Sequence, residues 1–322
     1  MKSENKHISW GIIGCGDVAE VKSGPAFQKA DHSKLLAVMR RDTAKAEDFA
    51  KRHGVPFWYD NASEIVSNEN IDAVYVATPP SSHLEYALLA LKAGKHVYLE
   101  KPMVLTLQES DVLIRAVNAS AGKLVVAHYR RFLPMYTHVK KLIDQKEIGD
   151  IKFVDIRFLK KEAPISEVNW RLTNSISGGG LFHDLAPHQL DLMYYFFGDY
   201  NQAYGFSQNQ KGKHDVPDIV NGIIDFENGM QFRGIWNFNA PDHLVEDDCT
   251  IYGSLGAISF SFYGNEVKVT TEYGDRIEHF QQPVNIQLPL IQEAVNYFQD
   301  KGSNPCSVDD GRIVMALIHA FT

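Results

Sequence analysis

Residues 8–20 read ISWGIIGCGDVAE: an apolar run of the kind that forms a buried strand, a turn with two glycines, and the start of a helix. The turn follows the pattern G-x-G-x-x-A in Gly14-Cys15-Gly16-Asp17-Val18-Ala19. Its glycines permit a tight bend and a close approach of a ligand, and the amide groups that begin a helix attract phosphate. Because an expected strand precedes the pattern and an expected helix follows it, it predicts a dinucleotide-binding turn rather than a purely structural one. The cofactor-binding residues expected here are Gly14, Gly16, Asp17, Val18 and Ala19.

Short apolar runs alternate with helical patterns along the first 130 residues. After the opening run, the candidates for buried strands are residues 35–39, 56–60, 71–79, 96–102 and 124–129. The helical patterns between them begin at capping signals, such as Thr106 with Glu109, and end at glycines, such as Gly94. This alternation predicts right-handed crossovers and an α/β fold with a parallel, doubly wound sheet.

The pattern changes near residue 150. From residues 151–158 onward, the expected strands alternate apolar and polar residues and are joined by tight turns at Asn228-Gly229 and Gly274-Asp275. A helix is expected to begin near Phe182. We therefore predict a second α/β domain with a large, open, mainly antiparallel sheet. The expected division is a dinucleotide-binding domain at residues 1–126 and a substrate-binding and oligomerisation domain at residues 127–322.

The composition excludes several classes of protein. The chain has 322 residues, with 32 Lys and Arg against 40 Asp and Glu, a net charge of −8. Nucleic acids and anionic membranes select basic surfaces, so neither is an expected partner. The polar start has no signal-peptide core, and no apolar run approaches the roughly 18 residues of a membrane span, so we expect a cytoplasmic protein. Three scattered cysteines (Cys15, Cys249 and Cys306) argue against a disulfide framework or a zinc site. The apolar end at residues 320–322 lacks a capping signal, which is what a truncated chain would show.

The end of the second expected strand bears on the choice of dinucleotide. A protein that binds NAD usually has Asp or Glu there, to accept hydrogen bonds from the ribose hydroxyls. This sequence has Arg40 and Arg41, whose guanidinium groups suit a 2′-phosphate through charge and paired hydrogen bonds. Two alternatives stay open: the arginines are solvated surface residues, or Asp42 turns inward. We expect NADP(H) to be favoured, with NAD(H) possible.

Two further segments lie at the carboxyl ends of expected strands, where doubly wound sheets bind their ligands. Glu100-Lys101-Pro102 follows the fifth strand, and its lysine is well placed to hold a substrate oxygen or the nicotinamide ribose. Thr78-Pro79 follows the fourth strand, with His83 nearby; the alternative for His83 is a helix-start residue without a chemical role. The cofactor-binding residues expected along this rim are Thr78, Pro79, His83, Glu100 and Lys101.

A polar constellation lies in the second half of the chain, within GGGLFHDLAPHQLD at residues 178–191. On a helix over residues 182–197, Asp184, His188 and Asp191 would share one stripe, provided that the helix starts late or kinks at Pro187. A carboxylate one turn from an imidazole can fix its tautomer and raise its basicity, which suits a proton shuttle. Three readings stay open: satisfied core polar groups, metal ligands that include His183, or an acid/base pair. We expect no metal, since no further donor cluster has suitable spacing.

These segments together resemble one known family. The segments GIIGCGDVA, AVMRRD, ATPPSSH, AGKHVYLEKP, YRRF and GGGLFHDLAPHQLD, in this order and spacing, are similar to the Gfo/Idh/MocA family of sugar and polyol oxidoreductases, along nearly the whole chain. The resemblance implies a Rossmann domain followed by an open-faced α/β domain, whose broad sheet commonly forms the contact in a homo-oligomer, here a dimer or tetramer.

The resemblance also implies roles for particular residues. Lys101 would touch substrate and cofactor, His188 would donate or accept a proton, and Asp184 would lie beside it. Two departures limit the substrate assignment. Arg40 replaces the acidic residue typical of NAD-dependent members, whereas the NADP-linked dihydrodiol and xylose dehydrogenases, which share the R-D pair, commonly have tyrosine in place of His188.

The expected reaction is reversible hydride transfer between the nicotinamide C4 and a carbinol carbon of a sugar, polyol or related cyclic hydroxy compound. His188 would exchange the hydroxyl proton, Asp184 would orient His188, and Lys101 would stabilise charge on the oxygen. The other expected substrate contacts are Tyr129, Arg131, Trp170, Arg171 and Asp191. Trp170 could instead be a core residue, and Arg131 could brace the domain junction.

Two rival functions belong to other classes. An NAD(P)-dependent glycosidase would recycle a tightly held cofactor within each turnover, without net consumption of NADPH. A nonenzymatic cofactor sensor would bind NADP(H) but would be indifferent to the loss of Lys101 and His188, and the presence of both residues counts against it.

Overall fold

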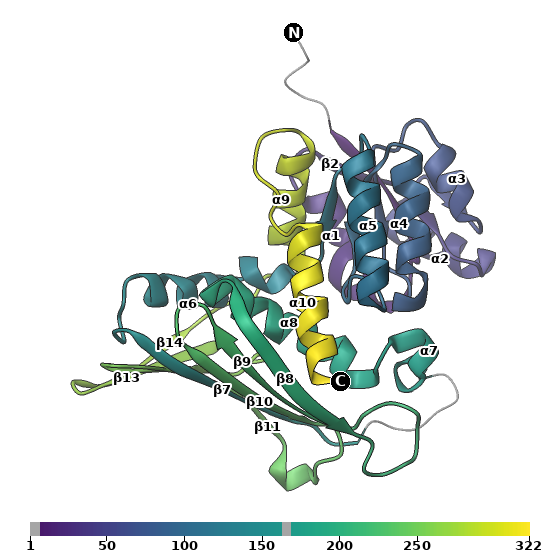
Figure 1. Cartoon of the computed structure of the whole chain (residues 1–322). Coiled ribbons are helices and arrows are strands. Elements are labelled where there is room, and N and C mark those ends of the chain that lie inside the picture. Colours follow the sequence, from purple (N-terminus) through teal and green to yellow (C-terminus); the bar gives the residue numbers. More distant parts are fainter. Residues whose placement is uncertain (1–6, 163–168) are drawn as a thin grey trace. The chain divides into compact units, whose positions relative to one another are not determined.

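The computed structural model describes residues 7–162 and 169–322, and its contacts divide the chain into two compact units (Figure 1). The first unit comprises Met1–Tyr129 and Pro283–Met315, and the second comprises Arg130–Gln282 and Ala316–Thr322. By packing, residues 283–315 therefore group with the first unit, whereas the sequence placed them in the second domain. The physical reason is the apolar face of α9 (Leu288–Phe298), where Phe298 packs on Trp10 at 5.7 Å between ring centroids.

The first unit is built on a six-stranded parallel sheet with the order β3-β2-β1-β4-β5-β6. Its strands are β1 (Ile8–Ile13), β2 (Ser33–Met39), β3 (Phe57–Tyr59), β4 (Ala73–Val76), β5 (His96–Leu99) and β6 (Leu124–Val126). Its other helices are α1 (Gly24–Lys29), α2 (Thr43–His53), α3 (Ala62–Ser67), α4 (His83–Lys92) and α5 (Leu107–Ala119). The order and the all-parallel pairing confirm the predicted doubly wound sheet.

The local signals in this unit act as expected. All residues of β1 and β4 are buried, as strands covered on both faces should be. At the start of α5, the amide of Glu109 donates to Thr106 Oγ1 at 3.1 Å, and the Glu109 carboxylate accepts from the amide of Thr106, which confirms the capping box.

The second unit is built on an eight-stranded sheet with the order β14-β13-β12-β11-β7-β10-β9-β8. The strands are β7 (Ile151–Leu159), β8 (Tyr200–Gln208), β9 (Ile219–Phe226), β10 (Gln231–Asn237), β11 (Glu246–Gly253), β12 (Gly256–Phe260), β13 (Glu266–Thr271) and β14 (Gly274–His279). Every pair is antiparallel except β7 with β10, so the mainly antiparallel sheet is confirmed. The hairpin at Asn228-Gly229 joins β9 to β10 as predicted. Gly274 is the first residue of β14 and pairs with Thr271, so the second tight turn, at residues 272–273, lies two residues earlier than expected.

Helix α8 (Gly180–Phe197) packs on one face of this sheet (Figure 1). Phe182 meets Trp236 of β10 edge to face, at 5.1 Å between ring centroids, and Trp236 Nε1 donates to Gln189 Oε1. The helix begins seven residues before Pro187 and contains it, so it does not start late. Pro187 has no N–H to donate to the preceding turn, and its buried ring packs in the core instead. Two further helices, α6 (Pro134–Asp144) and α7 (Asn174–Ser177), belong to this unit, and α10 (Val308–Phe321) begins in the first unit and ends here.

A buried ion pair joins α8 to the turn at Tyr129–Phe132. Arg131 Nε lies 2.9 Å from Asp191 Oδ2 and Nη2 lies 2.7 Å from Oδ1, so the pair is bidentate. The two side chains are only 7% and 1% exposed. Both charges have left water, and their mutual geometry has to compensate for that desolvation.

The part of the chain that the structure describes contains no helix long and apolar enough to cross a membrane.

We predict that Asp191→Asn strongly destabilises the second unit, because it leaves the buried Arg131 guanidinium without its carboxylate. The expected loss is roughly 3–5 kcal/mol in the free energy of unfolding. Denaturant unfolding followed by tryptophan fluorescence, to which Trp236 of the second unit contributes, measures it. The matched control is Glu246→Gln, which breaks the exposed pair with Arg157 and should cost less than about 1 kcal/mol. Equal, small losses in both variants would contradict the structural weight given to the buried pair.

Candidate functional site

The turn after β1 is shaped by a glycine that no other residue could replace without distortion. Gly14 has a φ of 96°, and its amide donates to the carbonyl of Met39 on β2 at 2.9 Å. A Cβ on Gly14 would lie 2.8 Å from Thr78 Cγ2 and 3.0 Å from the backbone of Ala77. At Gly16, by contrast, a Cβ would meet nothing within 4 Å. The backbone is therefore compact on the side facing β4 and open at Gly16, which fits a backbone that a ligand approaches closely.

A helical segment follows this turn. Asp17 is exposed, Val18 is half-buried and Ala19 is buried, where a π-helical turn (Ala19–Ser23) begins and leads into α1. The amide of Glu20 donates to the carbonyl of Gly16 at 2.9 Å, so this bond already belongs to the helix. The structure thus brings together the residues expected to hold a pyrophosphate, at the start of a helix. Such single π-helical turns often occur at functional sites.

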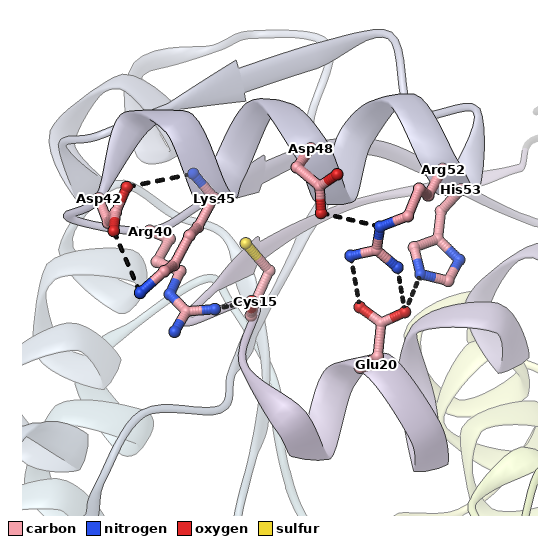
Figure 2. Close-up of polar contacts among 8 residues, drawn as sticks. All are labelled: Cys15, Glu20, Arg40, Asp42, Lys45, Asp48, Arg52 and His53. Atoms are coloured by element: carbon pink, nitrogen blue, oxygen red, sulfur yellow. Dashed lines mark hydrogen bonds and ion pairs between the residues drawn. The ribbon is translucent and has the colours of Figure 1, made fainter. Parts of the chain in front are cut away.

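Arg40 and Asp42, at the end of β2, have different surroundings (Figure 2). Arg40 is half-buried, and its Nη1 donates to the carbonyl oxygen of Cys15 at 3.4 Å, whereas Arg41 is exposed. Asp42 does not turn inward: it is the N-cap of α2, where Oδ1 accepts from the amide of Lys45 at 3.2 Å and Oδ2 lies 3.3 Å from Lys45 Nζ. The amide of Lys45 lowers the pKa of Asp42 below its ordinary value. The carboxylate of Asp42 is thus committed to its own helix, and Arg40 lies against the glycine turn.

A second cluster in Figure 2 ties the helical segment after the glycine turn to the last turn of α2. The carboxylate of Glu20 accepts hydrogen bonds from Arg52, at both of its oxygens, and lies 2.8 Å from His53 Nε2. Arg52 also donates to Asp48 at 2.8 Å. The hydrogen bonds from Arg52 are the largest cause of a lowered pKa of Glu20. Sequence motifs did not predict this cluster, since Glu20 and Arg52 lie 32 positions apart without a shared motif.

The cysteine inside the glycine turn has no sign of reactivity. Burial raises the pKa of the Cys15 thiol to about 11, although Arg40 opposes that effect. The thiol therefore stays protonated at neutral pH. The hydrogen bond from Arg40 goes to the backbone carbonyl of Cys15 and not to its sulfur.

At the ends of β4 and β5, His83 joins the two turns that the sequence singled out. Its ring is fully buried, with Nδ1 2.8 Å from the carbonyl oxygen of Pro102 and Nε2 2.8 Å from that of Thr78. Burial lowers the pKa of His83, although both carbonyls oppose the shift. Both ring nitrogens therefore face protein carbonyls. Direct contact of His83 with a cofactor stays a prediction, as it does for the half-buried Thr78 and Pro79.

The Glu100-Lys101-Pro102 segment is buried at both ends and more accessible at the lysine between them. Glu100 is buried and accepts hydrogen bonds from Tyr75 and Gln287, whereas Lys101 is half-buried. The Lys101–Pro102 peptide bond is cis. Tyr129, an expected substrate contact, is buried at the end of the first unit.

In the second unit, the structure brings the expected substrate-site residues together in two groups. Arg171 Nε donates to Asp184 Oδ2 at 2.7 Å, and the Arg171 guanidinium lies over the ring of Trp170 at 4.5 Å. The other group is the buried pair of Arg131 with Asp191 described above. His188 is buried on α8 between these two carboxylates in sequence. The expectation that Asp184 orients His188 stays a prediction.

Two glycines at the start of α8, Gly179 and Gly180, have structural reasons of their own. Gly180 has a φ of 77°, and a Cβ there would lie 2.6 Å from Val216. A Cβ on Gly179 would lie 2.3 Å from the ring of His183, which packs directly on that glycine. Burial lowers the pKa of His183 to about 3, so its imidazole stays neutral. Within the described ranges, no three His, Cys, Asp or Glu side chains are placed to hold a metal ion.

The comparisons with known proteins agree with this architecture. Residues 8–128 match the model of an oxidoreductase family with an NAD-binding Rossmann fold, and residues 136–259 match the GFO/IDH/MocA C-terminal domain. The chain is 48% identical over 320 residues to Oxidoreductase P35 of Formosa agariphila, with 98% of both chains covered.

Two more distant proteins are also similar. Trans-1,2-dihydrobenzene-1,2-diol dehydrogenase of Xenopus laevis is 32% identical over 174 residues, which span 53% of this chain and about half of that protein (52%). The structure of a levoglucosan dehydrogenase in complex with NADH and levoglucosan superposes with a TM-score of 0.87 at 25% identity, covering 98% of this chain and 96% of the other. Both family models and a full-length relative thus lead to one conclusion: the chain belongs to the Gfo/Idh/MocA family of oxidoreductases.

Proposed function

We propose that this oxidoreductase prefers NADP(H) and acts on a carbinol or carbonyl carbon of a sugar, polyol or related cyclic hydroxy compound. The observation that carries the cofactor preference is the arrangement at the end of β2. Arg40 lies against the glycine turn, while Asp42, the acidic residue two positions later in the chain, caps α2 and pairs with Lys45. A guanidinium in this place favours a 2′-phosphate, and Arg41, which is exposed, can add a second positive charge.

The first unit would hold the dinucleotide along the carboxyl ends of its strands. The backbone at Gly14 and Gly16 and the amides of Asp17, Val18 and Ala19 would receive the pyrophosphate, since the turn is open at Gly16. The rim at Thr78, Pro79 and Lys101 would lie toward the nicotinamide. When bound, the dinucleotide supplies or accepts the hydride, and the chain's own residues provide placement and proton transfer.

Three side chains would act on the substrate. Lys101 would donate a hydrogen bond to the reacting oxygen and stabilise negative charge there, and His188 would take the hydroxyl proton in oxidation and return it in reduction. Asp184, which accepts a hydrogen bond from Arg171 at 2.7 Å, would orient His188 and add a further polar group beside the substrate. The imidazole of His188 is buried, which suits this work, because a partly dry site strengthens each electrostatic contact. The other proposed substrate contacts are Tyr129, Trp170, Arg171, Arg131 and Asp191. The ion pair of Arg131 with Asp191 would also help to shape the substrate site.

We further propose that the protein is a cytoplasmic homo-oligomer, a dimer or tetramer, that pairs through the open face of its second sheet. Tyr204, Phe206 and Ile223 are 60%, 81% and 57% exposed on that face. Apolar side chains gathered in this way mark interaction surfaces, and a second copy of the same sheet would offer matching ones.

A substrate screen tests the proposed activity. Sugars, polyols and their keto forms, together with levoglucosan and trans-1,2-dihydrobenzene-1,2-diol, which the names of the related enzymes suggest, are mixed with the protein and either cofactor. The absorbance of reduced nicotinamide is then followed. Net turnover with at least one hydroxy or keto compound is expected. Cofactor binding without net turnover across the whole panel would contradict the proposal and favour internal recycling or a sensor.

We predict that Arg40→Ala weakens the binding of NADPH by roughly 10- to 100-fold, the size of a lost charge-assisted hydrogen bond, and leaves the binding of NADH nearly unchanged. Titration calorimetry with both cofactors measures the two dissociation constants. Arg115→Ala, at an exposed arginine on α5, is the matched control and should change neither constant. Equal dissociation constants for NADPH and NADH in the unmodified protein would remove the phosphate-binding role of Arg40.

We predict that His188→Ala abolishes turnover of the best compound from the screen while the affinity for NADP(H) stays within about twofold, because the imidazole is proposed to act on the substrate proton and not on the cofactor. Initial rates and calorimetry on the same preparation separate the two effects. Thermal unfolding of the variant verifies that it is folded. Full activity in a folded His188→Ala protein would exclude the acid/base role.

A further inference from the structure

A buried carboxylate at the end of β5 is held by more donors than a simple turn requires. Glu100 is 7% exposed. Its Oε1 accepts from Tyr75 Oη at 2.6 Å and from Gln287 Nε2 at 2.7 Å, and its Oε2 accepts from the backbone amide of Lys101 at 3.2 Å. A carboxylate removed from water has to recover its solvation from such bonds. Each of these donors therefore helps to fix where Glu100, and with it the backbone of Lys101, can lie.

The directions of the hydrogen bonds all lead to this one carboxylate. On the side of β4, Ser23 Oγ donates to Tyr75 Oη at 2.9 Å, which leaves the phenol proton for Glu100. Burial, and secondarily Glu100, raises the pKa of Tyr75 well above its ordinary value, so the phenol remains a donor. Ser23 ends the π-helical turn that follows the glycine motif. This side of the network thus links the expected pyrophosphate site to Glu100.

The other side of the network comes from the segment that returns to the first unit late in the chain. Gln287 is 1% exposed and precedes α9; its Oε1 accepts from Tyr98 Oη at 3.0 Å, so its NH₂ group faces Glu100. Two residues earlier, Asn285 Oδ1 accepts from Lys29 Nζ of α1 at 2.6 Å. The segment that contains Asn285 and Gln287 is therefore held against α1. The side-chain amide of Gln287 contacts Glu100 although the two residues lie 187 positions apart in the sequence.

We propose that Gln287 is a positioning residue for Lys101, which it orients through Glu100. This inference rests on the proposed function, in which Lys101 serves the nicotinamide end of the cofactor and the substrate. Without the side chain of Gln287, Glu100 Oε1 accepts a hydrogen bond from one side chain, Tyr75, instead of from two. The carboxylate then gains freedom to turn, and the amide of Lys101 loses a fixed acceptor. The role is distinct from that of Tyr98, which touches Gln287 but not Glu100 in these bonds.

The test compares the whole cofactor with its adenosine half. Gln287→Met keeps the volume of the side chain but removes its hydrogen bonds, and Tyr75→Phe removes the other side-chain donor to the same oxygen. Ser33→Ala is the matched control, since it deletes a buried hydrogen bond of the same unit, from Ser33 Oγ to the carbonyl of Phe27 at 2.6 Å, without touching Glu100 or Gln287. Dissociation constants for NADPH and for 2′,5′-ADP, which lacks the nicotinamide, are measured by calorimetry for each variant. NADH and ADP-ribose replace them if NADH binds more tightly.

The expected result is a split between the two probes. Gln287→Met and Tyr75→Phe weaken NADPH binding roughly tenfold, about the effect of one hydrogen bond to a charged group, and leave 2′,5′-ADP binding unchanged. Ser33→Ala changes neither constant by more than about twofold. In protein labelled with ¹⁵N-lysine, the Lys101 amide exchanges its hydrogen faster in Gln287→Met but not in Ser33→Ala. Gln287→Met adds little to the loss that Lys101→Met causes alone, because both act on one contact.

Three outcomes would overturn the inference, and the last differs from the other two. If Lys101→Met weakens NADPH binding but Gln287→Met does not, or if Gln287→Met, Tyr75→Phe and Ser33→Ala weaken both probes alike, Gln287 only supports the fold. If Lys101→Met leaves NADPH binding and turnover unchanged, the proposed role of Lys101 fails first, and the role of Gln287 fails with it.

Discussion

The first unit depends on a steric constraint at Gly14. At the end of β1, the amide of Gly14 donates a hydrogen bond to the carbonyl of Met39 on β2. Thr78 and Ala77, at the end of β4, lie so close that a Cβ on Gly14 would meet them at 3.0 Å or less. The absence of that one atom lets the ends of three parallel strands converge. Convergence then places Arg40, the glycine turn and the rim at Thr78 on one edge of the sheet. Without it the edge would spread, and the backbone amides would no longer be available at close range to a phosphate.

Charge at this edge is set by local hydrogen bonds and not by the net charge of the chain. Two carboxylates at the ends of β2 and β5 are held by the protein itself: Asp42 by the start of α2, and Glu100 by Tyr75 and Gln287. Arg40 makes a single long hydrogen bond to a carbonyl. An overall charge of −8 is screened beyond roughly 8 Å at physiological salt, so it does not oppose a phosphate bound at Arg40.

Short-range patterns in the sequence predicted much of the fold. The strand-helix alternation, the capping box at Thr106 and the hairpin at Asn228-Gly229 each depend on residues a few positions apart, and the structure confirms all three. Helix α8 shows the limit of local rules, because Pro187 suggested a late start and burial of the helix outweighs that preference. The return of residues 283–315 to the first unit was not predicted, since periodicity identifies an amphipathic helix but not the surface that covers it.

The candidate site likewise combines residues that sequence motifs identify with contacts that no motif predicts. Arg40, Lys101 and His188 were identified from motifs, whereas the cluster of Glu20 with Arg52 and the contact of Gln287 with Glu100 join residues far apart in sequence. Hydrogen-bonded pairs of this kind have no spacing that a single sequence displays. They emerge only once the strands and helices are packed, and they hold in place the groups that the motifs supply.

The central claim is that the edge of the first sheet binds a 2′-phosphorylated dinucleotide through Arg40. The most direct measurement is ³¹P NMR of the 2′-phosphate of NADP⁺ bound to the protein, recorded across a pH titration. A free phosphate monoester loses its second proton with a pKa of about 6. The account predicts that the bound 2′-phosphate stays dianionic well below that pH, and that Arg40→Ala restores the ordinary titration. A bound 2′-phosphate that titrates as it does in free NADP⁺ would contradict the claim.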